Sequence, residues 1–145
     1  MILALDCGRT TGWARSDGTT GVVRFGHPDN GEAFLAWMLW LADAFSERRV
    51  DTLLLERPFM ASRLRDADFT PSLVNIAHAI AYTHDVPRHE IAAVSVRKTV
   101  FGRGNKLTDN QRIAAVRDMG WAVRTDHEAD AVALLLAWQE QKVAA

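Results

Sequence analysis

Four residues of types that can bind divalent metal ions stand out in this chain: two close apolar runs, and two lie at the start of an expected helix. Asp6 closes the run ILALD at the N-terminus, and Glu56 closes the run TLLLE fifty residues later. His127 and Asp130 are three residues apart at the start of an expected helix, which puts them on one face. Carboxylates at strand ends, with a further pair on a helix, suit an octahedral Mg²⁺ site that keeps room for water and phosphate. The pattern predicts phosphoryl chemistry on a nucleic acid.

Each of these residues has a simpler role when it is taken alone. Asp6 could be a turn residue, and Glu56 could be a solvated strand end or the ion-pair partner of its neighbour. His127 is compatible with an ordinary surface histidine. Asp130 differs, because it stands in an otherwise apolar stretch of helix where an unpaired buried carboxylate would be costly. Asp126 is expected to cap this helix.

Hydrophobic patterning predicts an α/β fold with a mixed sheet in one domain, residues 1–145. The turn Asp17-Gly18 joins two of the strands and predicts an antiparallel meander. If strands 2–6 and 51–56 are adjacent and parallel, Asp6 and Glu56 meet at one sheet edge, where such folds form their sites. The expected strands are 2–6, 12–16, 20–26, 51–56 and 90–95, with a brief extended piece at 121–123. The expected helices are 30–48 (with Asp29 or Asn30 as its cap), 71–84, 96–101, 108–118 and 127–142.

Composition excludes several classes of protein. The chain has 145 residues, 48% of them hydrophobic, and a net charge of −1, which is typical of one globular domain. No apolar run reaches the roughly 20 residues of a membrane span, and no signal peptide is visible. The single cysteine, Cys7, cannot form an intramolecular disulfide, so a cytoplasmic protein is expected. Basic residues gather between Arg88 and Arg117 and after Glu56, where they form either a phosphate-binding surface or solvated helix faces.

Four segments in order resemble the RuvC family of Holliday junction resolvases, within the RNase H-like superfamily. They are ILALDCGRTTGWA, LLLERPF, VRKTVFGRGNKLTDNQRIAAVRDMG and DHEADAVALLLA. The resemblance implies an RNase H-like fold, with a mixed five-stranded sheet flanked by helices. It also implies a homodimeric endonuclease that depends on Mg²⁺, with Mn²⁺ as the alternative. Such an enzyme nicks four-way DNA junctions symmetrically in recombination and repair.

The same resemblance implies roles for individual residues. The catalytic and metal-binding positions of the family, which hold two ions per site, fall on Asp6, Glu56, His127 and Asp130. Asp126 is a second candidate for the third of these positions, although the H-x-x-D spacing favours His127. Phe59 matches an aromatic residue that stacks on unpaired bases at the junction centre, although a packing role is equally compatible. The basic residues of the predicted DNA surface would hold phosphates. The predicted DNA contacts are Arg57, Phe59, Arg63, Lys98, Arg103, Lys106 and Arg112.

Other functions are compatible with the same residues. A nuclease of this fold could act on other branched DNA or on RNA, as YqgF-like relatives would suggest, and a non-cleaving junction-binding domain would keep the basic surface. DCGRTTG also resembles the phosphate loop of sugar kinases, actin and Hsp70 ATPases, but those need two such domains. A compact chain of this kind could be phage-encoded. A two-fold dimer would place two sites on opposing strands. Its interface could use the second helix (Val74, Ile76, Ala77, Ile80, Ala81) or the Trp37/Trp40 region, although most of these residues suit a core better.

Overall fold

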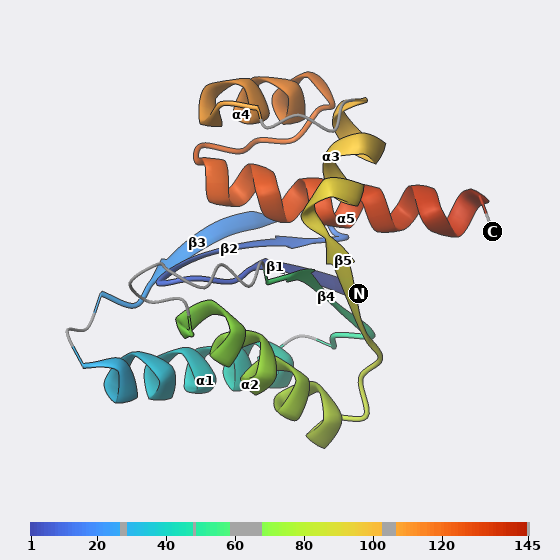
Figure 1. The fold of residues 1–145 in the computed structure, drawn as a ribbon. Coiled ribbons are helices and arrows are strands. Elements are labelled where there is room, and N and C mark those ends of the chain that lie inside the picture. Colours follow the sequence, from blue (N-terminus) through green and yellow to red (C-terminus); the bar gives the residue numbers. More distant parts are fainter. Residues whose placement is uncertain (27–28, 48, 59–67, 103–106, 145) are drawn as a thin grey trace.

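The computed structural model describes residues 1–26, 29–47, 49–58, 68–102 and 107–144 (Figure 1). Four of the predicted DNA contacts, Phe59, Arg63, Arg103 and Lys106, lie outside these ranges. Within them, five strands form one sheet in the order β3-β2-β1-β4-β5. The strands are β1 (Ile2–Asp6), β2 (Thr10–Arg15), β3 (Thr20–Arg24), β4 (Thr52–Arg57) and β5 (Arg88–Ala92). The helices are α1 (Asn30–Glu47), α2 (Phe69–Thr83), α3 (Ala93–Phe101), α4 (Asp109–Asp118) and α5 (Asp126–Ala144).

The strand pairing brings the two predicted acidic strand ends together. β1 pairs with β2 and β2 with β3 in antiparallel fashion, so the predicted meander is confirmed. β1 pairs with β4 in parallel, with Leu5 opposite Leu55, and β4 pairs in parallel with β5. Asp6 and Glu56 directly follow Leu5 and Leu55, so they lie at the same edge of the sheet. The sheet is therefore mixed and five-stranded, as expected.

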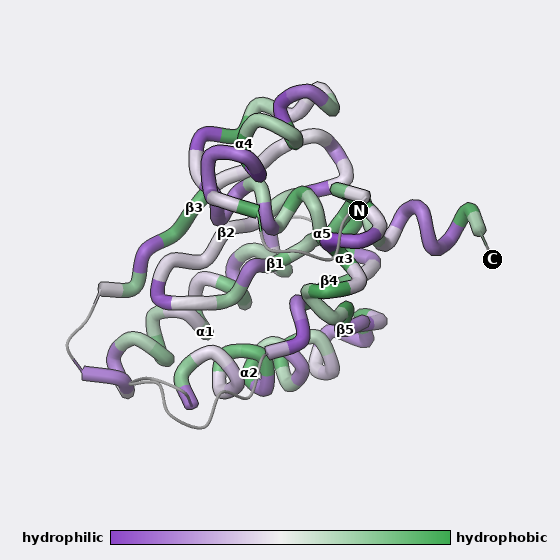
Figure 2. Tube along the Cα trace, turned by 45° about the horizontal axis from the view of Figure 1, so that its top comes forward, coloured by the Kyte–Doolittle hydropathy of each residue, from purple (hydrophilic) through white to green (hydrophobic). Residues whose placement is uncertain are grey.

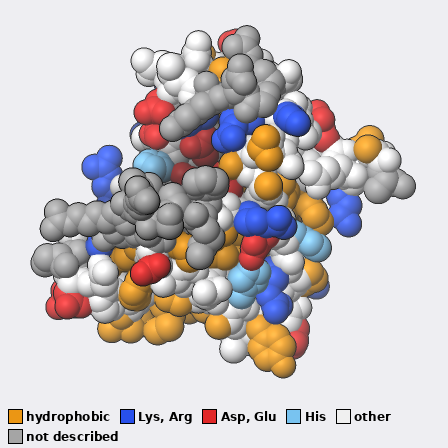
Figure 3. All heavy atoms as spheres, viewed as in Figure 1, with side chains coloured by type: hydrophobic (Ala, Val, Ile, Leu, Met, Phe, Trp, Pro, Cys, Tyr) orange, Lys and Arg blue, Asp and Glu red, His pale blue; other side chains and the backbone are white. Residues whose placement is uncertain are grey.

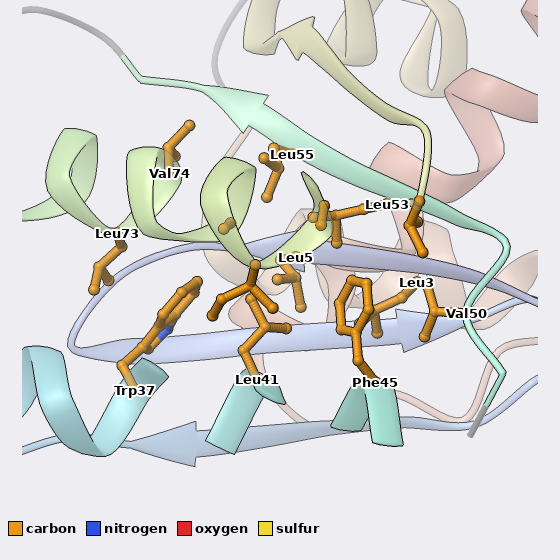
Figure 4. Close-up of a cluster of buried hydrophobic side chains, with 14 of the residues drawn as sticks. Leu3, Leu5, Trp37, Leu41, Phe45, Val50, Leu53, Leu55, Leu73 and Val74 are labelled. Atoms are coloured by element: carbon orange, nitrogen blue, oxygen red, sulfur yellow. The ribbon is translucent and has the colours of Figure 1, made fainter. Parts of the chain in front are cut away.

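Helices cover both faces of the sheet (Figure 1). Because successive side chains of a strand point to opposite faces, Leu3 and Leu5 pack with α1 and α2 (Figure 4), whereas Ala4 belongs to the core formed with α5. On β4, Leu54 likewise belongs to the core formed with α5, whereas its neighbours Leu53 and Leu55 belong to the core formed with α1 and α2. The C-terminal end of α5 extends past the sheet and is mostly hydrophilic there (Figure 2).

Small residues let α5 lie close to the sheet. Ala4 and Ala14 are opposite each other on β1 and β2, and both are fully buried beneath the helix. Gly12 lies opposite Asp6 on β2. A Cβ at this position would overlap the backbone carbonyl of His127, so the close approach of the helix requires a glycine here. The helix contributes alanines to the same contact, so the layers approach closely at the end that carries His127 and Asp130.

Several predicted boundaries were wrong: β2 begins at Thr10 instead of residue 12, β3 ends at Arg24 instead of residue 26, and α3 begins at Ala93 instead of residue 96. α2 begins at Phe69 instead of Pro71, because Phe69 is buried and a proline is tolerated in the first turn. β5 covers Arg88–Ala92 instead of 90–95, because its pairing with β4 ends at Arg57 opposite Ala92 and the chain then turns into α3. Residues 121–123 are described, but they form no strand.

The suggested interface residues contribute mainly to the core. Trp37 on α1 is fully buried, and so are Ala77 and Ala81 on α2, where Val74 is 2% exposed. These side chains pack between α1, α2 and the sheet, as Figure 4 shows for Trp37 and Val74. They are therefore not available to a second subunit. None of the helices in the described ranges has the length and apolar character needed to cross a membrane.

Candidate active site

The two strand-end carboxylates point to the face that α5 covers. Asp6 continues the alternation from Ala4, and Glu56 continues it from Leu54, so both follow residues of the α5 core. The loop after Asp6 is fixed by Thr11, which is fully buried. Its hydroxyl donates to the carbonyl of Gly8 at 2.7 Å and accepts from the indole N–H of Trp37 at 2.9 Å. These hydrogen bonds link the loop after Asp6 to Trp37, which belongs to the core between the sheet, α1 and α2.

A capping box at the start of α5 fixes the helix that carries the other two candidates. Thr125 is the N-cap, because its carbonyl accepts from Ala129 N–H at 3.1 Å and its hydroxyl accepts from Glu128 N–H at 3.2 Å. Glu128 is 2% exposed and accepts in return from the backbone N–H groups of Arg124 and Thr125, both at 2.9 Å. The prediction of Asp126 as the cap was wrong, since the helix already begins there.

Glu128 was missed as a positioning residue, although the sequence carries a signal for it. The spacing of a threonine and a glutamate three residues later, T-x-x-E, is that of a capping box. Glu128 Oε1 accepts from the hydroxyl of Thr20 on β3 at 3.3 Å, and this bond connects the helix start to the sheet. This buried carboxylate therefore sets the position of His127 and Asp130 relative to the strands.

His127 and Asp6 are in direct contact. His127 Nδ1 lies 2.8 Å from Asp6 Oδ2, and the two side chains are 36% and 23% exposed. The hydrogen bond to Asp6 raises the pKa of His127, and the charges of Asp126 and Asp130 act in the same direction. A proton on Nδ1 that is donated to Asp6 leaves Nε2 free to accept a proton or bind a metal ion. Asp6 and His127, two of the four predicted residues, are thus joined by a hydrogen bond.

Asp130, Asp126 and Asp109 surround the guanidinium of Arg112. Arg112 Nε lies 2.9 Å from Asp130 Oδ1, and Arg112 Nη2 lies 2.9 Å from Asp109 Oδ1 and 3.6 Å from Asp126 Oδ2. The Arg112 side chain is only 13% exposed. Its predicted contact with DNA phosphate stays a prediction, but in the structure this arginine faces carboxylates.

Negative charge accumulates at this end of the sheet. Burial raises the pKa of Glu56 to about 7, and the charge of Asp6 adds to the effect, whereas Arg97 and Arg112 oppose it. Burial likewise raises the pKa of Asp130 to about 7, with Asp6, Glu56 and Asp126 adding and Arg112 opposing. Mutual repulsion among partly buried carboxylates is the electrostatic condition that a bound cation relieves. Arg97, on α3, was not singled out by the sequence.

The donor set is chemically suited to Mg²⁺ or Mn²⁺. It offers carboxylate oxygens from two strands and one helix, together with one imidazole, beside side chains that repel one another. No three of the described His, Cys, Asp and Glu side chains are arranged to hold a metal ion as they stand. Asp6 is turned to His127, and Asp130 is turned to Arg112. Figure 3 shows acidic, histidine and basic side chains gathered beneath α4.

Two other residues of the predicted DNA surface are described. Lys98 is exposed on α3, as a phosphate contact would require. Arg57 is 62% exposed, and its Nε lies 3.6 Å from Glu90 Oε2 on the neighbouring strand. Both contacts with DNA remain predictions. Cys7, beside Asp6, is a partly buried thiol whose pKa is raised by burial and by the charges of Asp6 and Glu56.

The fold resembles that of solved Holliday junction resolvases. Thermus thermophilus RuvC superposes with a TM-score of 0.78 at 18% identity, covering 99% of this chain and 95% of that one. T. thermophilus RuvC in complex with a Holliday junction substrate gives 0.78 at 16% identity, with the same coverage. The yeast mitochondrial Holliday junction resolvase Ydc2 gives 0.55 at 10% identity, covering 98% and 78%. No protein-family model and no curated protein matches the sequence.

These similarities identify the fold class. The chain has the RNase H-like fold in the form seen in RuvC, over nearly its whole length. The resemblance inferred from four short motifs is therefore confirmed at the level of the fold. At such low identities the chemistry must be argued from the residues of this chain.

Proposed function

We propose that this protein is a metal-dependent, structure-selective endodeoxyribonuclease that nicks four-way DNA junctions symmetrically. The observation that carries the proposal is the meeting of Asp6, Glu56 and the start of α5 at one sheet edge, in a fold shared with junction resolvases. Such an arrangement of carboxylates suits phosphoryl transfer, because a cleaved phosphodiester needs its charge neutralised and a water activated. Branched DNA would be the partner, and recombination or repair the context.

Each of the four candidate residues would have a role that follows from its position in the cluster. Asp6, Glu56 and Asp130 would hold the two Mg²⁺ or Mn²⁺ ions, with Asp6 at the centre of the cluster. When bound, such ions supply an activated water and neutralise charge on the phosphate. His127 either joins the ligands through Nε2 or accepts the proton of the attacking water there, since Nδ1 is directed to Asp6.

Hydrolysis would follow an in-line course. The water oxygen forms a bond to phosphorus, its proton passes to a base, and the bond from phosphorus to the 3′ oxygen breaks. The 3′ oxygen takes a proton from solvent, which leaves 5′-phosphate and 3′-hydroxyl ends. The exposed Lys98 would bind a backbone phosphate of the junction.

Cleavage of a synthetic four-way junction by the wild type and by Asp6→Asn tests the proposal. We expect paired symmetric nicks with Mg²⁺ for the wild type and a loss of at least about a thousandfold in the variant, because Asp6 is the central ligand. Junction binding, measured by gel shift, should be retained. Linear duplex, flap and fork DNA serve as substrate controls, and Glu140→Gln on the exposed end of α5 is the matched variant.

Three results would change the conclusion. Nicking by Asp6→Asn at the wild-type rate would end the metal model. Cleavage of flaps, forks or RNA alone would keep the site and assign a different substrate. Tight junction binding by the wild type without cleavage in Mg²⁺ or Mn²⁺ would identify a binding domain.

A further inference from the structure

Arg112 is a largely buried cation that contacts one of the proposed metal ligands, Asp130. Its guanidinium touches Asp130 and Asp109 at 2.9 Å and lies 3.6 Å from Asp126. Asp126 and Asp130 belong to the first two turns of α5, and Asp130 is a proposed metal ligand. The side chain is 13% exposed, so these contacts are made with little competition from water.

The helix that carries Arg112 is held at both ends. Thr108 and Gln111 form a reciprocal capping box, with Thr108 N–H donating to the Gln111 side chain at 2.9 Å and Gln111 N–H donating to the Thr108 hydroxyl at 3.3 Å. At the other end, Arg117 Nε donates to the carbonyl of Val123 at 2.8 Å. α4 therefore presents Arg112 to α5 from a fixed position, and the pairing is built into the fold.

We propose that Arg112 is a built-in counter-cation, which neutralises Asp126 and Asp130 in the metal-free protein and opposes the binding of metal ions there. This inference rests on the proposed function, since it concerns regulation of the same site. Asp130 Oδ1 is adjacent to the guanidinium, so a divalent ion that binds Asp130 must share this carboxylate with a positive charge or displace it. By linkage, the metal weakens the arginine contact as much as the arginine weakens metal binding.

The proposal predicts two effects of opposite sign for Arg112→Gln. Without metal, the variant should unfold at a lower temperature, because three carboxylates lose their partner. Its dissociation constant for Mn²⁺ should nevertheless be about five- to tenfold lower than that of the wild type, at the lower end of the couplings typical between two sites. A residue that only supports the fold would lower stability without tightening metal binding.

The experiment measures Mn²⁺ binding by calorimetry and thermal unfolding with and without chelator, using the full chain. Lys142→Gln removes an exposed cation near the end of α5, twelve residues beyond Asp130, so it should leave metal affinity at the wild-type value. Arg112→Lys keeps the charge but cannot contact Asp109 and Asp130 together, so a smaller tightening is expected. It supplies the test if Arg112→Gln does not fold.

The outcomes separate this inference from the proposed function. Tighter Mn²⁺ binding in Arg112→Gln or Arg112→Lys, with Lys142→Gln unchanged, supports it. If these Arg112 variants bind Mn²⁺ as the wild type does, or more weakly, the counter-cation role of Arg112 is wrong, whereas the proposed nuclease function is unaffected. Absence of Mn²⁺ binding in every variant and in the wild type overturns both.

Discussion

Glu56 makes no hydrogen bond or ion pair with the described residues, and its position makes its charge unfavourable in the metal-free fold. Its pKa is raised from the usual value to about 7, because burial and the Asp6 charge both disfavour the carboxylate. The unfolded chain loses this proton near pH 4.5, whereas the folded protein keeps it to about pH 7. Stability from this group is therefore complete below pH 4.5 and is lost as pH rises towards 7.

Glu56→Gln should consequently stabilise the metal-free protein at pH 8 by about 1 kcal/mol and change little near pH 4. The amide resembles the protonated acid and carries no charge to be repelled. Chemical denaturation at both pH values, with chelator present, measures the difference. Glu140→Gln, on the exposed end of α5, is the control that should show no pH-dependent gain. Equal or lower stability of Glu56→Gln at pH 8 would show that Glu56 is not repelled in the fold.

Individual residues differed in how far the sequence could predict them. The meeting of Asp6 and Glu56 follows from two apolar runs that each end in an acid, because parallel neighbours bring such ends together. The pairing of Arg112 with Asp130 could not be predicted, since it depends on how α4 packs on α5. Glu128 could have been found from the T-x-x-E spacing, but the cap was assigned to Asp126 instead.

At the scale of elements, the closeness of α5 to the sheet depends on Gly12. A Cβ at this position would overlap the backbone carbonyl of His127, so a side chain here must push the helix start outwards. Gly12 also lies opposite Asp6 on the neighbouring strand. The contact between His127 and Asp6, at 2.8 Å, therefore requires that position 12 carry no side chain.

Gly12→Ala should lower the free energy of unfolding by about 2–3 kcal/mol, in the range of overpacked cores. Cleavage should fall much further than stability, since the helix that carries His127 and Asp130 is displaced. Gly26→Ala is the matched control, because a Cβ at Gly26 meets nothing within 4 Å. Thermal unfolding and junction cleavage measured on both variants give the comparison. Wild-type stability and activity of Gly12→Ala would mean that the helix start is not held against β2.

The order of the elements was predictable because most of them carry their own signal. The three-stranded meander has alternating apolar residues and a turn at Asp17-Gly18, and α1 has an aspartate at its start, Asp29, that accepts from Gly31 and Glu32. The boundary between β5 and α3 was misplaced because EIAAVS suits a strand as well as a helix. There the pairing with β4, which ends at Ala92, decides where the strand stops.

At the scale of the whole molecule, the proposed substrate bears on the number of subunits. The candidate site lies at one edge of the sheet and is built from residues of one chain. A four-way junction has two-fold symmetry, and paired nicks need two sites related by the same axis. The core packing of Trp37 and Ala77 means that a second subunit must use other surfaces.

We therefore predict that the active form is a two-fold dimer. Sedimentation at micromolar concentration should give twice the chain mass of 16.1 kDa. Mixing the wild type with an excess of Asp6→Asn should convert paired cuts into single nicks, because mixed dimers hold one working site each. Mixing the wild type with the same excess of Glu140→Gln keeps all sites intact and should leave paired cuts. A monomer in sedimentation, with paired cuts that persist in the mixture, would mean that each nick is made independently.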